Sequence, residues 1–262
     1  MELYIAGGVG EHGRNCFFLQ NGGDAILVDC GLMAGSDDPL PRLTESQIRK
    51  LKAVFLTHSH ADHTGALPWL LRQGYTGPII STTPTLQQLP FIVQNAVALE
   101  QVAPRNEKCN GITWGLSGHC EGSVWLKLDW DDKAILFSGD YTEQSAVYPC
   151  DVLRNQVADL AVLDCAYGHD STLWNDSVTA AAAAVENLLE KNPIVFLPVP
   201  KYGRGLDLLL QIRRRLPYVP LYGDAHFCKQ TEIALVDGKW YKPLPQRILR
   251  SVRPDAAENE GV

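Results

Sequence analysis

Short apolar runs, bounded by glycine or polar residues, recur along the N-terminal part of the chain and predict β-strands that end in functional loops. Two of these runs, DAILVD at 24–29 and DLAVLD at 159–164, end in a carboxylate. The run KAVFLT at 52–57 leads directly into the polar segment HSHADH. Between 111 and 140, the runs ITWGLS, SVWLKLDW and AILFSGD are separated by short turns, which predicts an antiparallel meander.

Helical patterns alternate with these strands. The segment 44–50 predicts one or two helical turns with Thr44 as the N-cap. The segment 64–73 predicts a helix with Pro68 near its first turn, where proline is tolerated. A longer helix is predicted over about 84–102, interrupted at a proline.

Beyond about residue 166, strands and helices alternate, as expected of parallel strands joined by crossover helices. The predicted elements are a helix within 177–191, a strand over 194–197, a helix within 205–216 and a strand over 219–222. The segment 243–262 is proline-bearing, then acidic, and predicts a poorly ordered tail. We therefore expect three parts, at 1–165, 166–228 and 229–262, of which the last is a partly disordered tail.

Composition narrows the possible classes. The 262 residues are 45% hydrophobic and carry a net charge of -7, which indicates a globular protein and excludes a surface that is basic all over. Nucleic acid would therefore need a locally positive groove. The seven cysteines include no C-x-x-C pair, no signal-peptide pattern is visible, and no apolar run is long enough to span a membrane. We expect a cytoplasmic protein with no membrane partner.

The candidate chemistry lies where strands end. Three histidines and an aspartate follow the strand at 52–57 directly, while a further histidine and aspartate each lie in a glycine-containing turn. These residues are His58, His60, Asp62, His63, His119 and Asp140. Imidazole nitrogen and carboxylate oxygen are ligands that suit Zn²⁺. Their type, order and strand context favour a metal site over a polar surface loop.

The run T-H-S-H-A-D-H at 57–63 resembles the signature of the metallo-β-lactamase fold superfamily. The resemblance implies an α/β fold, the αββα sandwich, and a metal-dependent hydrolase. It assigns one metal to His58, His60 and His119, and a second to Asp62 and His63, with Asp140 bridging both. It further implies that Asp29 supports the histidine loop through hydrogen bonds, and that Asp62 orients or deprotonates the nucleophile.

Further segments are similar to the β-CASP nucleases of that superfamily, the RNase J-like branch. GGVGEHGRNCFFLQ resembles the glycine-rich N-terminal loop of that group, and VLDCAYGHD places a supporting acid at Asp164. PVPKYGRGLDLLLQI resembles the segment that opens the inserted β-CASP domain. The resemblance covers about 1–225 and implies a partial β-CASP-like α/β segment after the sandwich.

The C-terminal part departs from that branch. Family members continue and supply two further histidines, one of which completes the second metal site, whereas only about forty residues follow the Gly-Arg helix here. We expect any replacement ligand to come from His226, His169, water or another chain. The sequence therefore leaves open whether the site holds one metal ion or two, and whether it is active.

Arginines near the predicted helix at 205–216 are candidates for contacts to phosphate. Arg204, beside Gly203, has the guanidinium geometry that grips phosphate, although an exposed arginine at a helix start fits the pattern equally well. The run of three arginines at 213–215 cannot share one helix face, so only part of it would meet nucleic acid.

Three functions remain in view. The first is a zinc-dependent nuclease acting on RNA or DNA through a metal-activated hydroxide, with one or two zinc ions, or with Mn²⁺. The second is a small-molecule ester, thioester or lactone hydrolase on the same fold. The third is a catalytically weak subunit that needs a homo-oligomer or another protein, bound through its C-terminal region.

Overall fold

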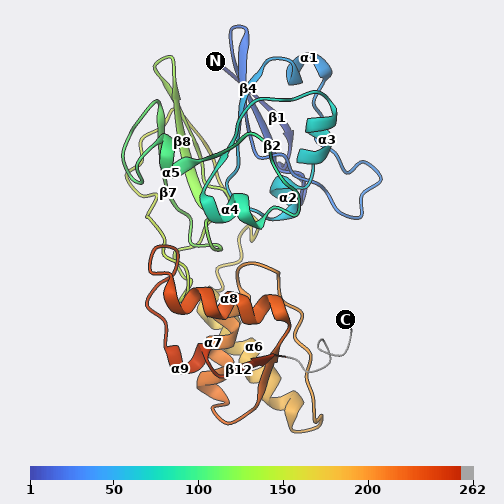
Figure 1. Ribbon diagram of the computed structural model, residues 1–262, viewed down its shortest axis with the longest axis vertical. Helices are drawn as coiled ribbons and strands as arrows, with labels where there is room; N and C mark the ends of the chain where they lie inside the picture. The colour runs from blue at the N-terminus through green and yellow to red at the C-terminus, as the bar shows by residue number, and fades with distance from the viewer. Residues whose placement is uncertain (255–262) are drawn as a thin grey trace. The chain divides into compact units, whose positions relative to one another are not determined.

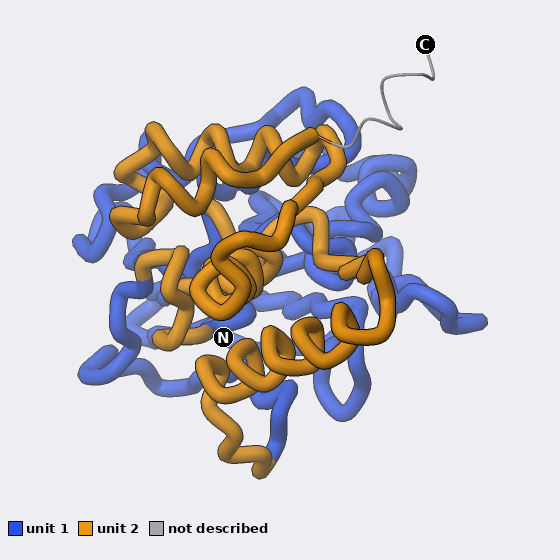
Figure 2. The backbone as a smooth tube through the Cα atoms, turned by 90° about the horizontal axis from the view of Figure 1, so that it is seen from below, with its two compact units in different colours: residues 1–117, 122–141, 150–168 blue, residues 118–121, 142–149, 169–262 orange. Residues whose placement is uncertain are grey.

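The computed structural model describes residues 1–254 and divides into two units (Figures 1 and 2). The first unit comprises 1–117, 122–141 and 150–168. The second comprises the turn 118–121, the segment 142–149 and the chain from 169 onward. Strands β1 to β10 belong to the first unit.

A six-stranded sheet in the order β1-β2-β3-β4-β5-β6 forms one layer of the first unit. Its strands are β1 (Glu2–Gly7), β2 (Cys16–Asn21), β3 (Asp24–Val28), β4 (Leu51–Phe55), β5 (Ile79–Ser81) and β6 (Ala96–Ala98). The first three strands pair antiparallel, whereas β3 to β6 pair parallel. The ends of β3 and β4 therefore point the same way, and the loops that follow them meet at one edge.

A four-stranded sheet in the order β10-β9-β8-β7 forms the second layer. Its strands are β7 (Ile112–Leu116), β8 (Val124–Trp130), β9 (Lys133–Phe137) and β10 (Leu160–Val162). The predicted antiparallel meander is confirmed, and β10 adds parallel to β9. The rings of Phe17 and Phe137 lie 5.7 Å apart between the two sheets, and the Val124 amide donates to the Thr57 carbonyl.

Helices α1 (Glu45–Ile48), α2 (Ala61–Thr64) and α3 (Leu67–Arg72) lie along one side of the six-stranded sheet (Figure 1). Leu67 and Leu70 are fully buried in a cluster that includes strand residues such as Leu27 and Val54. Thr44 caps α1 through a capping box, and a proline stands in the first turn of α3, as predicted. The predicted α/β class, with two sheets as layers of a sandwich, is confirmed.

The long helix predicted over 84–102 is wrong. Helix α4 (Thr83–Gln88) ends early, and Leu89 is extended, the conformation that the following proline favours. The chain then forms β6, which pairs with β5, before the short helix α5 (Leu99–Val102). Ladder hydrogen bonds to a neighbouring strand outweigh the local helical pattern here.

The second unit contains four helices and two strands within the described residues. They are α6 (Trp174–Leu189), α7 (Gly205–Arg215), β11 (Leu221–Gly223), α8 (Ala225–Val236), α9 (Gln246–Leu249) and β12 (Val252–Pro254). Ala182 and Val185 of α6 pack against Ile212 of α7. Strands β11 and β12 pair parallel. The strand predicted over 194–197 is not formed, and no described strand pairs with this segment, in which Phe196 is 85% exposed.

The prediction of a poorly ordered tail is wrong as far as residue 254, and 255–262 lie outside the described residues. Trp240, Tyr241 and Leu249 are buried, and the Lys242 amide donates to the Val147 carbonyl. The segment is polar on average, but the burial of these three side chains fixes it in the fold. The part boundaries at 165 and 228 stay predictions. No helix within 1–254 is long and apolar enough to cross a membrane.

Candidate metal centre

The first group of candidate ligands follows strand β4. His58 is fully buried in the loop after the strand, His60 is the N-cap residue of α2, and Asp62 and His63 lie within that helix. The rings of His58 and His60 meet edge to face, with 4.7 Å between their centroids. A short loop followed by a single helical turn therefore brings three imidazoles and a carboxylate to one end of the strand.

Asp29 supports this loop from the neighbouring strand β3. Its buried carboxylate accepts hydrogen bonds from the Thr57 amide and the Thr57 hydroxyl, each at 2.8 Å. Its Oδ2 also lies 2.7 Å from Nδ1 of His63. Because Nδ1 is engaged in this way, Nε2 of His63 is the nitrogen that faces the site.

His119 and Asp140 come from the four-stranded sheet. His119 lies in the turn between β7 and β8, whose neighbouring residues on both sides belong to the first unit. Asp140 follows β9 through Gly139, which has a φ of +54°. A Cβ on Gly139 would lie 2.8 Å from Cβ of Thr57. Only glycine allows this turn to pass so close to the histidine loop.

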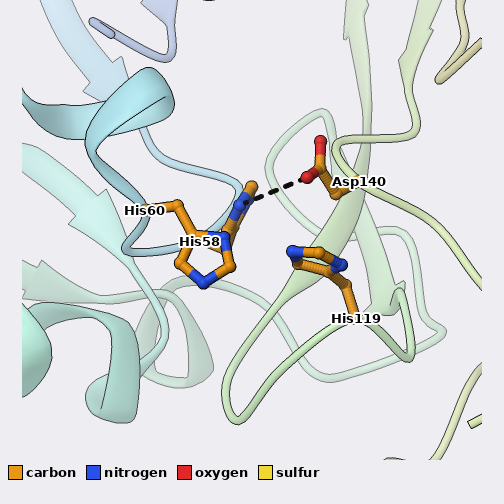
Figure 3. A group of neighbouring side chains, drawn as sticks. All are labelled: His58, His60, His119 and Asp140. Atoms are coloured by element: carbon orange, nitrogen blue, oxygen red, sulfur yellow. Dashed lines mark ion pairs between the residues drawn. The ribbon is translucent and has the colours of Figure 1, made fainter. Parts of the chain in front are cut away.

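Four of the predicted ligands converge. His58, His60, His119 and Asp140 each offer one ligand atom, and these atoms all lie within 4.8 Å of one another (Figure 3). Oδ2 of Asp140 is 3.8 Å from Nε2 of His58. Three imidazoles and a carboxylate form a donor set that suits zinc.

The other two predicted ligands, Asp62 and His63, lie on the side of Asp140 that carries its second oxygen, Oδ1. Nε2 of His63 is 3.2 Å from Oδ1 of Asp140 and 3.7 Å from Oδ2 of Asp62. Two atoms that each bind one tetrahedral zinc at roughly 2.0–2.2 Å are about 3.4 Å apart. The spacing of the side chains therefore fits a metal ion on this side of Asp140 as well.

The electrostatics of the site favour a positive charge. Burial by itself lowers the pKa of His63, but the nearby carboxylates of Asp29 and Asp140 outweigh burial and raise this pKa well above its usual value. In the metal-free protein these carboxylates therefore favour the protonated ring over the neutral one. A metal ion at Nε2 would compete with that proton.

A cavity of about 510 Å³ opens beside the His63 side of the centre. Its walls include the glycine-rich loop over 8–13, the candidate ligands Asp62, His63 and Asp140, and the rings of two phenylalanines. Asn15 also lines it, and its side-chain nitrogen lies 3.0 Å from Nε2 of His63. Asn15 was not predicted as a site residue, although its place between the glycine-rich loop and β2 was a usable signal.

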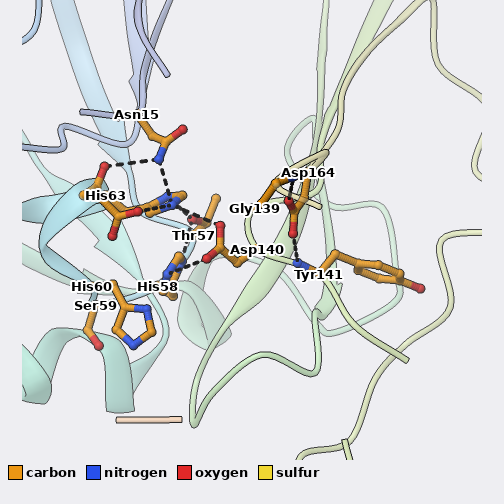
Figure 4. A network of polar contacts seen from close by, with 12 residues as sticks. Asn15, Thr57, His58, Ser59, His60, His63, Gly139, Asp140, Tyr141 and Asp164 are labelled. Carbon is orange, nitrogen blue, oxygen red and sulfur yellow. Dashed lines mark hydrogen bonds and ion pairs between the residues drawn. The ribbon is translucent and has the colours of Figure 1, made fainter. Parts of the chain in front are cut away.

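Asp164 holds the turn that carries Asp140. Its carboxylate accepts a hydrogen bond from the amide of Tyr141 at 3.2 Å (Figure 4) and one from the amide of Ala166 at 2.9 Å. Its own amide donates to the hydroxyl of Ser138. These contacts fix the backbone on the C-terminal side of Asp140.

The possible replacement ligands have other surroundings. Nε2 of His226 lies 2.9 Å from the carbonyl oxygen of Lys201, and the ring meets Tyr202 edge to face. His169 is exposed. Neither histidine belongs to the metal-capable group found among the described residues.

The candidate phosphate-binding residues are engaged within the second unit. The guanidinium of Arg204 lies over the Trp174 ring, 4.7 Å from its centroid. The Gly203 carbonyl accepts a hydrogen bond from the Tyr148 hydroxyl. Both residues take part in local packing at the start of α7, and their role in binding phosphate stays a prediction.

Comparison with known proteins gives one family match and several curated relatives. The sequence matches the family described as the metallo-beta-lactamase superfamily over residues 9–188. Transcription termination factor FttA of Methanosarcina mazei is 27% identical over 89% of this chain and 43% of its own length. FttA of Cenarchaeum symbiosum is 41% identical over 81% of this chain and 39% of its own. Ribonuclease TTHA0252 of Thermus thermophilus is 24% identical over 86% of this chain and 58% of its own.

The chain thus spans 39% to 58% of the length of these curated relatives. Among solved structures, the metallo-beta-lactamase fold protein YhfI from Bacillus subtilis matches 52% of this chain and 61% of its own, with a TM-score of 0.38 and 17% identity.

Proposed function

The chain belongs to the metallo-beta-lactamase superfamily, and on this premise we propose that it is a zinc-dependent phosphodiesterase that cleaves RNA. The carboxylate of Asp140 carries the proposal. One oxygen faces His58 at 3.8 Å and the other faces His63 at 3.2 Å, as a carboxylate shared by two metal ions requires. RNA is favoured over DNA because the names of relatives include a ribonuclease and endoribonuclease ysh1 of Emericella nidulans.

The proposed ligands divide between two positions. His58, His60 and His119 would hold the first ion, and Asp62 and His63 the second, with Asp140 shared. Zinc is the proposed metal because histidine nitrogen dominates the first position. Manganese is the alternative for the second position, where two of the three side chains supply oxygen.

Metal ions in these positions would supply Lewis-acid stabilisation of the phosphoryl group and lower the pKa of a water molecule. The other steps belong to side chains of this chain. Asp62 lines the cavity and accepts the proton of the attacking water. Asp29 holds Nδ1 of His63, so that Nε2 stays directed at the site. Asp164 keeps the Asp140 turn in place through the Tyr141 amide.

A small-molecule ester, thioester or lactone hydrolase is the second candidate, and the cavity favours it. Its volume of about 510 Å³ lies within the range of small-molecule sites, and the rings of Phe17 and Phe137 give it an apolar part. Hydrolysis of a labelled RNA oligonucleotide, compared with that of thioester and lactone substrates, distinguishes the two. Faster turnover of a small ester than of RNA by the same preparation would favour the second candidate.

The metal content of the protein is the first test. Protein purified without chelator or added metal is expected to hold close to two zinc ions per chain by elemental analysis, and to cleave RNA. His226→Ala is expected to leave this number unchanged, since the His226 ring lies against the Lys201 carbonyl. One zinc or fewer in the parent, with no cleavage, would contradict the two-metal proposal. A rate of cleavage per chain that rises with protein concentration would instead favour a homo-oligomer or a partner-completed site.

A further inference from the structure

Helix α4 contacts both loops that carry the candidate histidines. At its C-terminal end, Oε1 of Gln88 accepts a 2.6 Å hydrogen bond from the hydroxyl of Ser59, the residue between His58 and His60. At its N-terminal end, the hydroxyls of Thr82 and Thr85 lie 2.6 and 3.2 Å from the carbonyl oxygen of Gly122. Gly122 follows the four-residue turn that contains His119. One short helix therefore links the loop that carries His58 and His60 to the residue that follows the His119 turn.

These contacts are shielded from water. Thr82 and Thr85 are fully buried, while Ser59 is 8% and Gln88 is 9% exposed. Where water is excluded, a hydroxyl that loses its protein partner has no substitute, so each contact strongly restrains the position of its loop. Exposed hydrogen bonds between the same groups would restrain the loops much less.

Gly122 is seated against the start of the helix. Its φ is +80°, and a Cβ would lie 2.7 Å from Oγ1 of Thr82 and 2.9 Å from Cβ of Pro84. The helix start is itself fixed, because Thr82 is the N-cap and accepts a hydrogen bond from the Thr85 amide. The Glu100 carboxylate also accepts a bond from the Thr83 amide. The helix is thus a spacer of defined length with a loop attached at each end.

We propose that α4 is a positioning element that sets the distance between the His58–His60 loop and the His119 turn. Gln88 acts through Ser59, and Thr82 and Thr85 act through Gly122. These residues are positioning residues, since they act on the loops as supporting groups act on metal ligands. The inference rests on the proposed function, because it takes the two histidine loops to bind the same metal ion.

The test measures zinc affinity by competition with a chromophoric chelator, using the full chain. Gln88→Leu removes the acceptor of the Ser59 hydroxyl, and Thr85→Val removes one donor to Gly122. Each is expected to weaken zinc binding about 10-fold, the lower end of what the loss of a supporting group costs. Gln88→Glu and Thr85→Ser keep the acceptor and the donor, and are expected to bind zinc within about twofold of the parent.

Tyr75→Phe is the control for a general loss of stability. The buried Tyr75 hydroxyl donates to the Pro78 carbonyl at 2.7 Å, in the same unit but on neither histidine loop. This variant is expected to melt earlier than the parent while it keeps the parental zinc affinity. If Gln88→Leu fails to fold, Ser59→Ala removes the same hydrogen bond from the loop side and takes its place.

Cobalt substitution gives a second readout that does not depend on activity. The visible absorption of cobalt reports the arrangement of its ligands, so Gln88→Leu is expected to shift or weaken the parental bands, whereas Gln88→Glu retains them. Folded Gln88→Leu and Thr85→Val proteins with parental zinc affinity and cobalt spectrum would overturn the positioning role alone. A parent protein that binds no zinc would overturn the proposed function and this inference together.

Discussion

The candidate metal centre and the arginine-bearing helix α7 differ in what their polar side chains do. At the centre, the ligand atoms of His58, His60, His119 and Asp140 converge within 4.8 Å. On α7, Arg213 donates to three backbone carbonyls beyond the helix end, and Arg215 pairs with Glu186. The first region directs its polar atoms towards a shared point, whereas the second uses them to hold its own fold.

This difference shows which sequence signals predict function. Metal chemistry requires particular residue types in a particular order, so the histidine motif leaves few other interpretations. A run of arginines has many uses, because a guanidinium can cap a helix, pair with a carboxylate or pack on a ring equally well. Charge alone therefore predicts a nucleic-acid surface poorly.

Of the variants that test this difference, the one that removes Asp140 is expected to have the largest effect, which is on zinc content and RNA cleavage. Asp140→Ala takes one oxygen from each proposed metal position, so bound zinc is expected to fall from about two ions per chain to below one, and RNA cleavage to fall by more than about 100-fold. Elemental analysis and a cleavage assay on the same preparation measure both. The matched variant Asp164→Ala, which changes only the support of the turn, is expected to lose less zinc. Parental zinc in Asp140→Ala would contradict the shared role.

Removing Asp29 tests whether the centre is built on its buried support. Asp29→Ala leaves the amide and hydroxyl of Thr57 and Nδ1 of His63 without their partner, which is expected to destabilise the metal-free protein by about 3 kcal/mol. Urea unfolding measures this change. Asp29→Asn keeps an oxygen for Thr57 and is expected to cost less. A loss below about 1 kcal/mol in Asp29→Ala would show that the loop is held by other contacts.

Arg213→Ala tests whether the arginines of α7 serve the fold and not RNA binding. The side chain donates to the carbonyls of Leu216, Pro217 and Val219, so its loss is expected to lower stability by about 1–3 kcal/mol while RNA affinity changes less than about twofold. Urea unfolding and a filter-binding assay separate the two effects. The exposed neighbour Arg214 offers the matched variant Arg214→Ala, for which little change in stability is expected. Weaker RNA binding by a fully stable Arg213→Ala would restore the nucleic-acid role.

The sequence predicted the α/β class of the fold and the residues that converge at the candidate site, but not all of the packing around them. All four residues of the converging group were identified from one motif and two glycine turns, because their chemistry restricts residue type. The helix α4 contacts were not predicted, since Ser59 meets Gln88, and Gly122 meets Thr82, only through the packing of distant segments. The strand β6 was mistaken for helix, because pairing with β5 depends on residues outside its own window.

The smallest expected effect is on thermal stability, and it concerns Arg14 of the first unit, which forms an ion pair with Glu11. Arg14 is 3% exposed, and its guanidinium binds both oxygens of Glu11 at 2.7 Å. The Arg14 hydrogen bonds lower the pKa of Glu11 from 4.5 to about 2. A lowered pKa means that the pair stabilises the fold above about pH 4.5, and that this contribution is lost as the pH falls towards 2.

Melting temperatures of the parent and of Glu11→Gln, measured from pH 7 to pH 2, test this contribution. The two curves are expected to differ most at neutral pH and to converge in acid, by a modest amount because the Glu11 side chain is partly exposed. Since Glu11 also lines the cavity, the variant is expected to loosen the glycine-rich loop without changing the zinc content. Parallel curves over the whole range would show that this pair contributes nothing that depends on its charge. Arg14 would then stabilise the fold through its hydrogen bonds to the carbonyls of Asp38 and Leu40.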